Sequence, residues 1–372
     1  MQRSLLSDAV IGRRTAVDIV SPGGQGLLVP AGERLARPDV EALAARGVRF
    51  VLLQDELFPA LADVTTLQVP TRLRAEEALS SLIEALGRTG GDPPAEETQT
   101  LLKAARGIVE DVTAADAPIA DLGPWDHQSW DPVEHAVLTA GIAVQIGRYY
   151  PLPRDQLLRL CVGTLLMDVG LPSGAAQPGA LDAAGVAQLM EHPREGWRLV
   201  HRFLPAIFPT SASVVLQHHE RLDGSGYPEG RAGNDIYLFA RIAAVADVFA
   251  AVRQDRPHRR RFRPADVLRV VEEEAGVSLD GDACDLLLRH VAIVPHGTIV
   301  RLTDGSLAKV VAHSIGAPLQ PLVVVVGGAL DQPVRRRQVN LRGTGLHVSE
   351  VLDAWPSALI DRMHRERPTL GA

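Results

Sequence analysis

The sequence has little cysteine, few aromatic residues and no long apolar run. Its two cysteines, Cys161 and Cys284, lie far apart and have no second thiol or histidine at ligand spacing, which excludes a disulfide framework and a zinc knuckle. The first residues lack the continuous apolar segment of a secretory signal, and no later segment approaches membrane-spanning length. We therefore expect a cytoplasmic protein without a membrane span.

An excess of positive charge is also absent. The 38 basic residues are outnumbered by 45 acidic residues, which leaves a formal charge of -7. This balance argues against a nucleic-acid-binding protein, because broad attraction to nucleic acid needs a positive field. A small anionic ligand needs only a local basic pocket. What is present is a 46% hydrophobic share over 372 residues, enough to form the cores of two or three domains.

Apolar periodicity and turn residues divide the chain into four regions. Residues 1–70 alternate strand, turn and helix patterns, which predicts a small α+β module. Residues 71–130 are rich in helix formers and are either a helical connector or the front of the next domain. Residues 131–290 are almost wholly helical in pattern, and residues 291–372 predict a β-rich subdomain. Its strands are expected over residues 298–302, 307–312 and 322–326, with a final helix over 349–363.

The densest polar segment is HHERLDGSGYP, from His218 to Pro228. The two histidines end an apolar helical pattern, and a glycine-rich turn begins directly after them. Adjacent residues on a helix diverge by about 100°, but both histidines can reach one metal pair if the helix ends there. The simpler interpretation is that the histidines are hydrogen-bonded structural residues and the glycines are only turn residues.

Two carboxylates lie where the helical pattern is most apolar. Asp168 directly follows the apolar segment 157–167, and Asp247 lies among small alanines in a predicted helix. An unpaired buried charge is costly, so each carboxylate needs a partner, and a metal cation is one. With His135 on an early helix and His192 before a proline, the chain offers a donor mixture that suits iron, manganese or zinc.

These residues, in this order, resemble the HD-GYP family. Its members carry an early histidine, then the motifs HDxGK, HP and HHExxDGxGYP, and a late aspartate. The long motif is complete here, with eight fixed residues in eleven positions. The resemblance covers about residues 131–275. It implies a mainly α protein built on an HD-type helical bundle, and an enzyme that hydrolyses the bacterial messenger cyclic di-GMP.

The resemblance also implies a metal site of one or two divalent ions, of iron or manganese. Asp168 and Asp247 would be its catalytic carboxylates, with Asp168 bridging the ions. The implied protein ligands are His135 and Asp247 for the first ion, His192, His218 and His219 for the second, and Asp168 for both. The implied contacts to cyclic di-GMP are Asp223, Gly226, Tyr227, Pro228, Arg256 and Arg259. The basic run that holds the two arginines is otherwise a solvated surface.

Two positions depart from the family pattern. Met167 stands where the HD motif has a histidine, and thioether sulfur is a poor ligand for hard divalent iron or manganese. Leu171 stands where the family has a lysine, so a cation that would neutralise charge on the scissile phosphate is missing. Asp131, four residues before His135, is a candidate replacement ligand if both lie on one helical face.

Three functions stay open at this point. The first is a cyclic di-GMP phosphodiesterase with a weakened binuclear site, which the retained ligand set favours. The second is an inactive receptor or protein-interaction module that binds cyclic di-GMP or a partner such as a diguanylate cyclase domain, which Met167 and Leu171 favour. The third is a general nucleotide phosphohydrolase, against which the complete long motif argues.

Overall fold

The structure is a computed structural model of the whole chain, and most of the helical region is described in detail. The described residues are 2–6, 8–16, 18–20, 26–48, 50–55, 57–58, 65–90, 92–115, 118–122, 131–171, 183–204, 208–254, 261–327, 336–352, 355–356 and 359. Among them, none of the helices combines the length and the apolar character that crossing a membrane requires.

The N-terminal region is a small α+β module, as expected. Two short antiparallel pairs accompany a 3₁₀ turn and one helix, and their apolar side chains form a separate core. In helix α1, Val40 and Leu43 are buried, and Gly47 takes a positive φ of 77° just past its end. The elements are β1 (Gln2–Leu5) paired with β4 (Phe50–Leu53), β2 (Ile19–Val20) paired with β3 (Leu27–Val29), the turn Asp8–Val10 and α1 (Arg37–Ala45).

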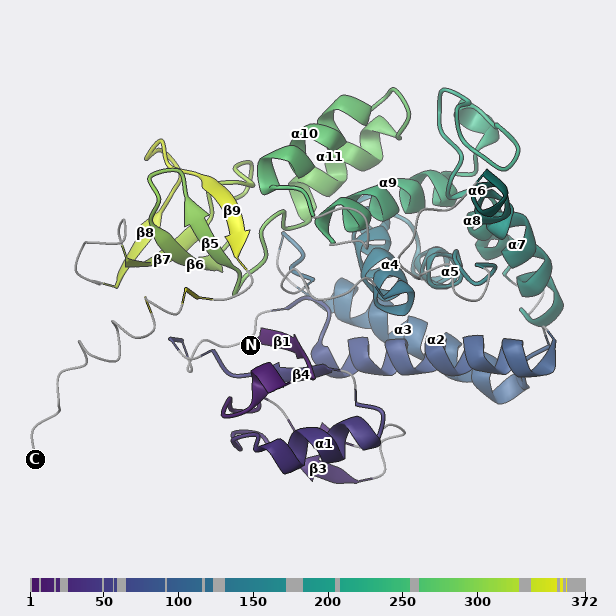
Figure 1. Cartoon of the computed structure of the whole chain (residues 1–372). Helices are drawn as coiled ribbons and strands as arrows, with labels where there is room; N and C mark the ends of the chain where they lie inside the picture. The colour runs from purple at the N-terminus through teal and green to yellow at the C-terminus, as the bar shows by residue number, and fades with distance from the viewer. Residues whose placement is uncertain are drawn as a thin grey trace, which may run out of the picture.

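Two long helices follow, α2 (Val69–Thr89) and α3 (Ala95–Ala114). Their apolar faces, which include Leu82 and Ile108, belong to the same hydrophobic core as the later helices. Figure 1 shows α2 and α3 side by side along one edge of the helical region. They therefore pack as part of the helical body, while the domain boundaries expected from the sequence stay a prediction.

The middle of the chain is helical, as expected. Helix α4 begins at an Asp131 cap and is buried along most of its length between α5 and α9 (Figure 1). The helices of this region are α4 (Pro132–Tyr149), α5 (Arg154–Leu165), α6 (Ala183–Met190), α7 (His192–Phe203), α8 (Pro209–Gln217), α9 (Leu238–Arg253), α10 (Pro264–Glu274) and α11 (Gly281–His290), with a 3₁₀ turn at Gly233–Asp235.

The C-terminal region is a five-stranded antiparallel sheet in the order β8-β7-β6-β5-β9. Its strands are β5 (Ile299–Leu302), β6 (Leu307–Ala312), β7 (Leu322–Gly327), β8 (Arg337–Asn340) and β9 (Val348–Leu352). The final helix expected over 349–363 is wrong at its start. Residues 349–352 lie in β9, because Val348 and Val351 are buried against β5, and most of the remaining segment lies outside the described residues.

A buried ion pair connects the N-terminal region to this sheet. Lys309 of β6 is 1% exposed, and its ammonium contacts the carboxylate of Asp55, which follows β4. The same carboxylate accepts the main-chain N–H groups of Leu57 and Phe58 at 2.9 and 2.8 Å. The mainly α fold with two small β-containing regions is therefore held together by contacts between residues far apart in the sequence.

Candidate metal centre

The first part of the site is the turn after α5, which carries Asp168. Gly170 in this turn lies so close to α7 that a Cβ there would come within 2.2 Å of the His192 carbonyl oxygen and 2.3 Å of the Gly196 nitrogen. Both atoms belong to the main chain and cannot rotate away. Glycine is thus required at this position, and the close contact places His192 next to Asp168.

A second close contact packs α8 against α5, near the end of α5 that leads into this turn. A Cβ on Gly163 of α5 would lie 2.7 Å from Cβ of Val214 and 2.8 Å from the Ser211 carbonyl oxygen. The two helices therefore cross at a point where one of them has no side chain. Helix α8 ends at Gln217, and His218 caps it, as the sequence predicted for the first histidine of the pair.

His192 and His218 present their Nε2 atoms to each other. Nδ1 of His192 lies 2.6 Å from the Leu189 carbonyl oxygen, and Nδ1 of His218 lies 2.9 Å from that of Val215. A carbonyl only accepts, so each Nδ1 carries the hydrogen and each neutral ring keeps a lone pair on Nε2. The Nε2 atoms are 3.2 Å apart, and Asp168 Oδ1 lies 3.3 and 3.8 Å from them. His192 and His218 are buried and Asp168 is half-buried, and these three donors fit a cation between them.

His219 completes what we call the four-residue cluster: Asp168, His192, His218 and His219. One ligand atom from each lies within 4.8 Å of the others. His219 Nδ1 also lies 3.9 Å from Asp247 Oδ2. The other oxygen of Asp247 lies 2.8 Å from Nε2 of His135, which is 1% exposed. The structure therefore brings together all six side chains that the resemblance implied as ligands.

The ionisation of these groups suits a cation. Burial raises the pKa of Asp168, but the imidazoles of His192 and His218 more than offset it and lower that pKa to about 2. Burial likewise opposes ionisation of Asp247, yet contact with His135 holds its pKa well below the usual range. Burial, and then His192, lower the pKa of His218 to about 4. Ionised carboxylates and neutral imidazoles are the forms that bind metal.

The loop after the two histidines is held by Glu220, which is buried. Its two carboxylate oxygens accept the main-chain N–H groups of Glu229 and Arg231 at 2.8 and 2.9 Å. Gly226 packs into the turn, where a Cβ would lie 2.4 Å from the His219 carbonyl oxygen. The glutamate and this glycine of the long motif therefore shape the loop around the metal centre.

The other motif residues divide between the cluster and the loop itself. The ring of Tyr227 lies against His219, with ring centroids 4.6 Å apart. Asp223 is exposed, and its Oδ1 accepts the main-chain N–H and the hydroxyl of Ser225 at 3.0 and 2.7 Å, so it stabilises the turn. The Pro228 carbonyl oxygen accepts a hydrogen bond of 2.7 Å from Arg194 of α7.

The two departures from the family pattern lie beside the cluster, whereas the expected phosphate contacts are not described. Met167 is fully buried and Leu171 is half-buried, on either side of Asp168 in the chain. Arg256 and Arg259, the expected phosphate contacts, lie outside the described residues.

Asp131, the candidate replacement ligand, has a capping role in the structure. Asp131 is the N-cap of α4, where its Oδ1 accepts the main-chain N–H groups of Val133 and Glu134 at 2.9 and 3.2 Å. The main-chain N–H of His135 donates to the Asp131 carbonyl oxygen at 2.9 Å, while the Asp131 carboxylate caps the helix. Asp131 as a replacement ligand stays a prediction.

Sequence analysis missed one polar residue at this centre, Gln254. It directly follows α9, is 6% exposed, and places its Oε1 2.9 Å from Nδ1 of His135. Its spacing of seven residues from Asp247, two helical turns, was a usable signal.

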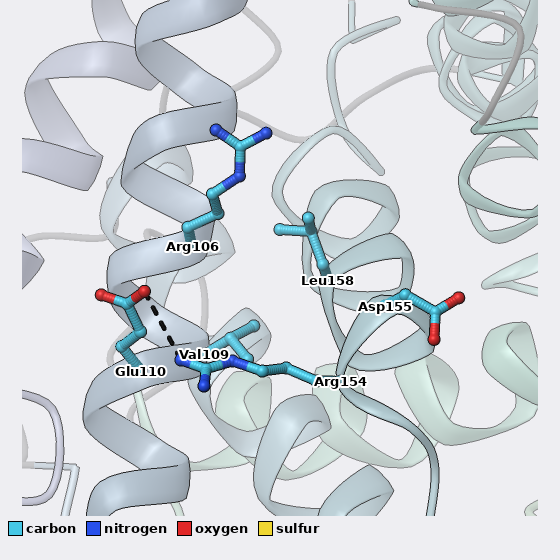
Figure 2. Close-up of a pocket in the computed structure, with 6 residues that line it drawn as sticks. All are labelled: Arg106, Val109, Glu110, Arg154, Asp155 and Leu158. Atoms are coloured by element: carbon cyan, nitrogen blue, oxygen red, sulfur yellow. Dashed lines mark ion pairs between the residues drawn. The ribbon is translucent and has the colours of Figure 1, made fainter.

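A surface pocket of about 270 Å³ lies elsewhere, between α3 and α5. Figure 2 shows its lining, in which Arg154 forms a 3.4 Å ion pair with Glu110. Arg154 begins α5, whereas Asp168 follows the other end of that helix, about 18 Å away along its axis. None of the residues that line this pocket was expected in the site, and its charged groups include both signs. The pocket residues are Arg106, Val109, Glu110, Arg154, Asp155 and Leu158.

Comparison with known proteins agrees with this geometry. Residues 126–283 match the model of the HD domain family. The chain is 30% identical over 240 residues to cyclic di-GMP phosphodiesterase PA4108 of Pseudomonas aeruginosa, covering 62% of this chain and 57% of that protein. It is 38% identical over 113 residues to the cyclic di-GMP phosphodiesterase response regulator RpfG of Xanthomonas campestris, covering 30% of each.

A third relative has a different named substrate. The chain is 32% identical over 168 residues to 3'3'-cGAMP-specific phosphodiesterase 3 of Vibrio cholerae, covering 42% of this chain and 36% of that protein. The chain thus spans less than two thirds of the length of each of these curated relatives. The resemblance to the HD-GYP family is confirmed, and the match to the HD domain family covers residues 126–283.

Proposed function

We propose that this chain is a metal-dependent phosphodiesterase that hydrolyses cyclic di-GMP in bacterial second-messenger signalling. The observation that carries the proposal is the four-residue cluster, whose ligand atoms lie within 4.8 Å of one another and whose His192 and His218 are buried. The names of the relatives support the substrate, since two of those described above are cyclic di-GMP phosphodiesterases.

In our proposal the metal ions are held unequally. The four-residue cluster would hold one ion. His135 and Asp247 would hold the other, with Asp168 contributing to both. The second group has fewer donors because Met167 occupies the position of the HD histidine. We therefore propose that one ion binds firmly and the other weakly, and that the ions are iron or manganese, which suit this mixture of nitrogen and oxygen donors.

A bound divalent ion would supply Lewis acidity toward the phosphoryl oxygens. The protein's own residues would do the rest. Asp168 and Asp247, both ionised, place negative charge at the positions proposed for the metal ions. The Tyr227 ring, which packs on His219, forms a wall of the site on the loop side. Leu171 cannot donate to a phosphate, so hydrolysis should be slower than with a lysine there.

Contacts to the dinucleotide stay predictions. We propose that Gly226, Tyr227 and the adjacent Pro228 line the ligand side of the loop. Asp223 contributes by stabilising the turn, as its bonds to Ser225 indicate. We further propose that Arg256 and Arg259 bind phosphate oxygens of the ligand. The cytoplasmic location and the pairing with a diguanylate cyclase domain also stay predictions.

The second candidate is a receptor that binds cyclic di-GMP without hydrolysing it. Met167 and Leu171 favour it, because one removes a metal donor and the other removes a cation. In this case the protein would act through a partner.

One experiment separates the two candidates. The purified protein, loaded with manganese or with iron under anaerobic conditions, is incubated with cyclic di-GMP and, separately, with 3'3'-cGAMP. Hydrolysis is followed by chromatography and binding by calorimetry, with His218→Ala as the control. Turnover of cyclic di-GMP that His218→Ala abolishes supports the enzyme. Tight binding without turnover supports the receptor. A protein that neither binds nor hydrolyses cyclic di-GMP would refute both candidates. Preference for 3'3'-cGAMP would refute the proposed substrate.

A further inference from the structure

We propose that Gln254 is a positioning residue that sets the tautomer of His135 and thereby makes it a ligand for the weakly held metal ion. This inference rests on the proposed metal-dependent function. It begins from the two ring nitrogens of His135, which face different partners. Nδ1 lies 2.9 Å from Oε1 of Gln254, and Nε2 lies 2.8 Å from Oδ1 of Asp247.

Helix α9 supplies both partners. Asp247 and Gln254 are seven residues apart, and two helical turns bring them to the same side of the helix end. Gln254 is the first residue past the helix, with an extended ψ of 144°. His135 comes from α4, which packs on α9. The imidazole is therefore held between a carboxylate and an amide, and at 1% exposure it has little access to water.

The contact with Gln254 selects one form of the ring. The amide oxygen accepts and cannot donate, so Nδ1 must carry a hydrogen. Asp247 Oδ1, 2.8 Å from Nε2, also only accepts, so without a metal ion Nε2 donates a hydrogen to that carboxylate. A bound cation would take the place of this hydrogen, while Gln254 keeps the hydrogen on Nδ1, so Nε2 is the nitrogen that can bind the cation. If the amide were rotated by 180°, its N–H would face Nδ1 and would need the lone pair there. The ring hydrogen would then lie on Nε2, where it would block metal binding. The hydrogen on Nδ1 of His135 is therefore the property that distinguishes the proposal from a purely structural role.

The other two buried histidine ligands are oriented by main-chain groups and not by a side chain. His192 and His218 donate Nδ1–H to the main-chain carbonyls of Leu189 and Val215, which no substitution removes. His135 depends instead on one side chain. Since outer partners of this kind typically change metal affinity by about 10- to 100-fold, the weaker site should depend strongly on Gln254.

The test compares three variants by titration with manganese, in which free Mn²⁺ is counted by electron paramagnetic resonance. Gln254→Leu removes the acceptor and should weaken the second, weaker binding step by about tenfold or more, leaving the first step intact. Gln254→Glu keeps an acceptor oxygen and should retain the natural affinity or raise it. Gln145→Leu is the matched control. Gln145 is also buried, ten residues along α4, and its amide donates to the His290 carbonyl at 3.1 Å. It should leave both steps unchanged.

A second measurement needs no variant. Nitrogen-15 NMR of the metal-free natural protein reports which ring nitrogen of His135 carries hydrogen, and the proposal requires Nδ1. A hydrogen on Nε2 alone overturns it, as does equal manganese binding by Gln254→Leu and the natural protein. Failure of the whole metal site is distinct, because His218→Ala would then leave both binding steps unchanged.

Discussion

Replacing Gly170 with alanine tests how the fold assembles the metal centre. The added Cβ would start 2.2 Å from the His192 carbonyl oxygen and 2.3 Å from the Gly196 nitrogen. Carbon and oxygen atoms in contact stay beyond about 3 Å, so the turn and the start of α7 must separate by about 0.8 Å. Nδ1 and Nε2 of His192 would move with the helix, away from Asp168.

The size of that shift decides the outcome. Metal sites tolerate errors of about 0.2 Å in ligand distance. A displacement several times larger should weaken binding of the firmly held ion by at least tenfold, which is about the effect of losing a residue that orients a ligand. Overpacking of this kind should also cost about 1–3 kcal/mol of folding free energy. The measurements are elemental analysis after dialysis and urea unfolding of the metal-free protein, so that lost metal does not itself lower the stability.

The control is Gly87→Ala on α2. A Cβ there meets nothing within 4 Å, and the residue is inside a helix, so alanine should stabilise the protein by about 0.5–1 kcal/mol and leave the metal content unchanged. A Gly170→Ala variant with natural metal content and stability would refute the argument that this close contact positions His192.

Other predictions concern the metals and a distant ion pair. The natural protein should hold fewer than two ions per chain after dialysis against a weak chelator, because Met167 supplies no suitable donor, and elemental analysis that finds two firmly bound ions would contradict this. His218→Ala should empty the four-residue cluster, and unchanged metal content would rule out the assignment. Met167→His with Leu171→Lys should raise cyclic di-GMP turnover about a hundredfold or more, and by more than either change alone; a fully loaded double variant that stays inactive would favour the receptor. Asp55→Asn should cost about 3 kcal/mol at pH 7, measured by urea unfolding, because it leaves Lys309 buried without its partner. Burial raises the pKa of Asp55, but Lys309 and main-chain N–H groups more than offset this and hold the pKa below its ordinary value. The stability that the ionised Asp55 contributes is therefore present above about pH 4 and is lost as the pH falls further. The cost of Asp55→Asn should therefore shrink in acid, and a cost that is the same at pH 7 and pH 3 would contradict the reasoning.

The sequence predicted best those elements whose signals lie within the element and its flanking turns. Strands β5, β6 and β7 were predicted within about one residue at each end, since their apolar pattern and flanking turns lie in the element itself. Strands β1, β8 and β9 were not predicted. Each is four or five residues long and is stabilised by a partner distant in the chain or by the edge of a sheet. The final helix was wrong for this reason, because local helix propensity yielded to pairing with β5.

The sequence by itself determined the chemistry of the site. The eleven residues from His218 to Pro228 carry two histidines at a helix end and a glycine turn, both of which depend on neighbours a few positions away. The order of the six metal-ligand candidates was also readable, as were the departures at Met167 and Leu171. None of these inferences needed a distance between remote residues.

Only the tertiary structure decided how those residues meet. The four-residue cluster joins the end of α5, the start of α7 and the end of α8, and it forms because glycines let these segments approach where any side chain would collide. Gln254 contacts His135 across 119 positions of the chain, and the hydrogen on Nδ1 of His135, His192 and His218 is set by an acceptor that the fold places beside it. Such contacts depend on packing between helices, which the pattern of a single helix does not contain.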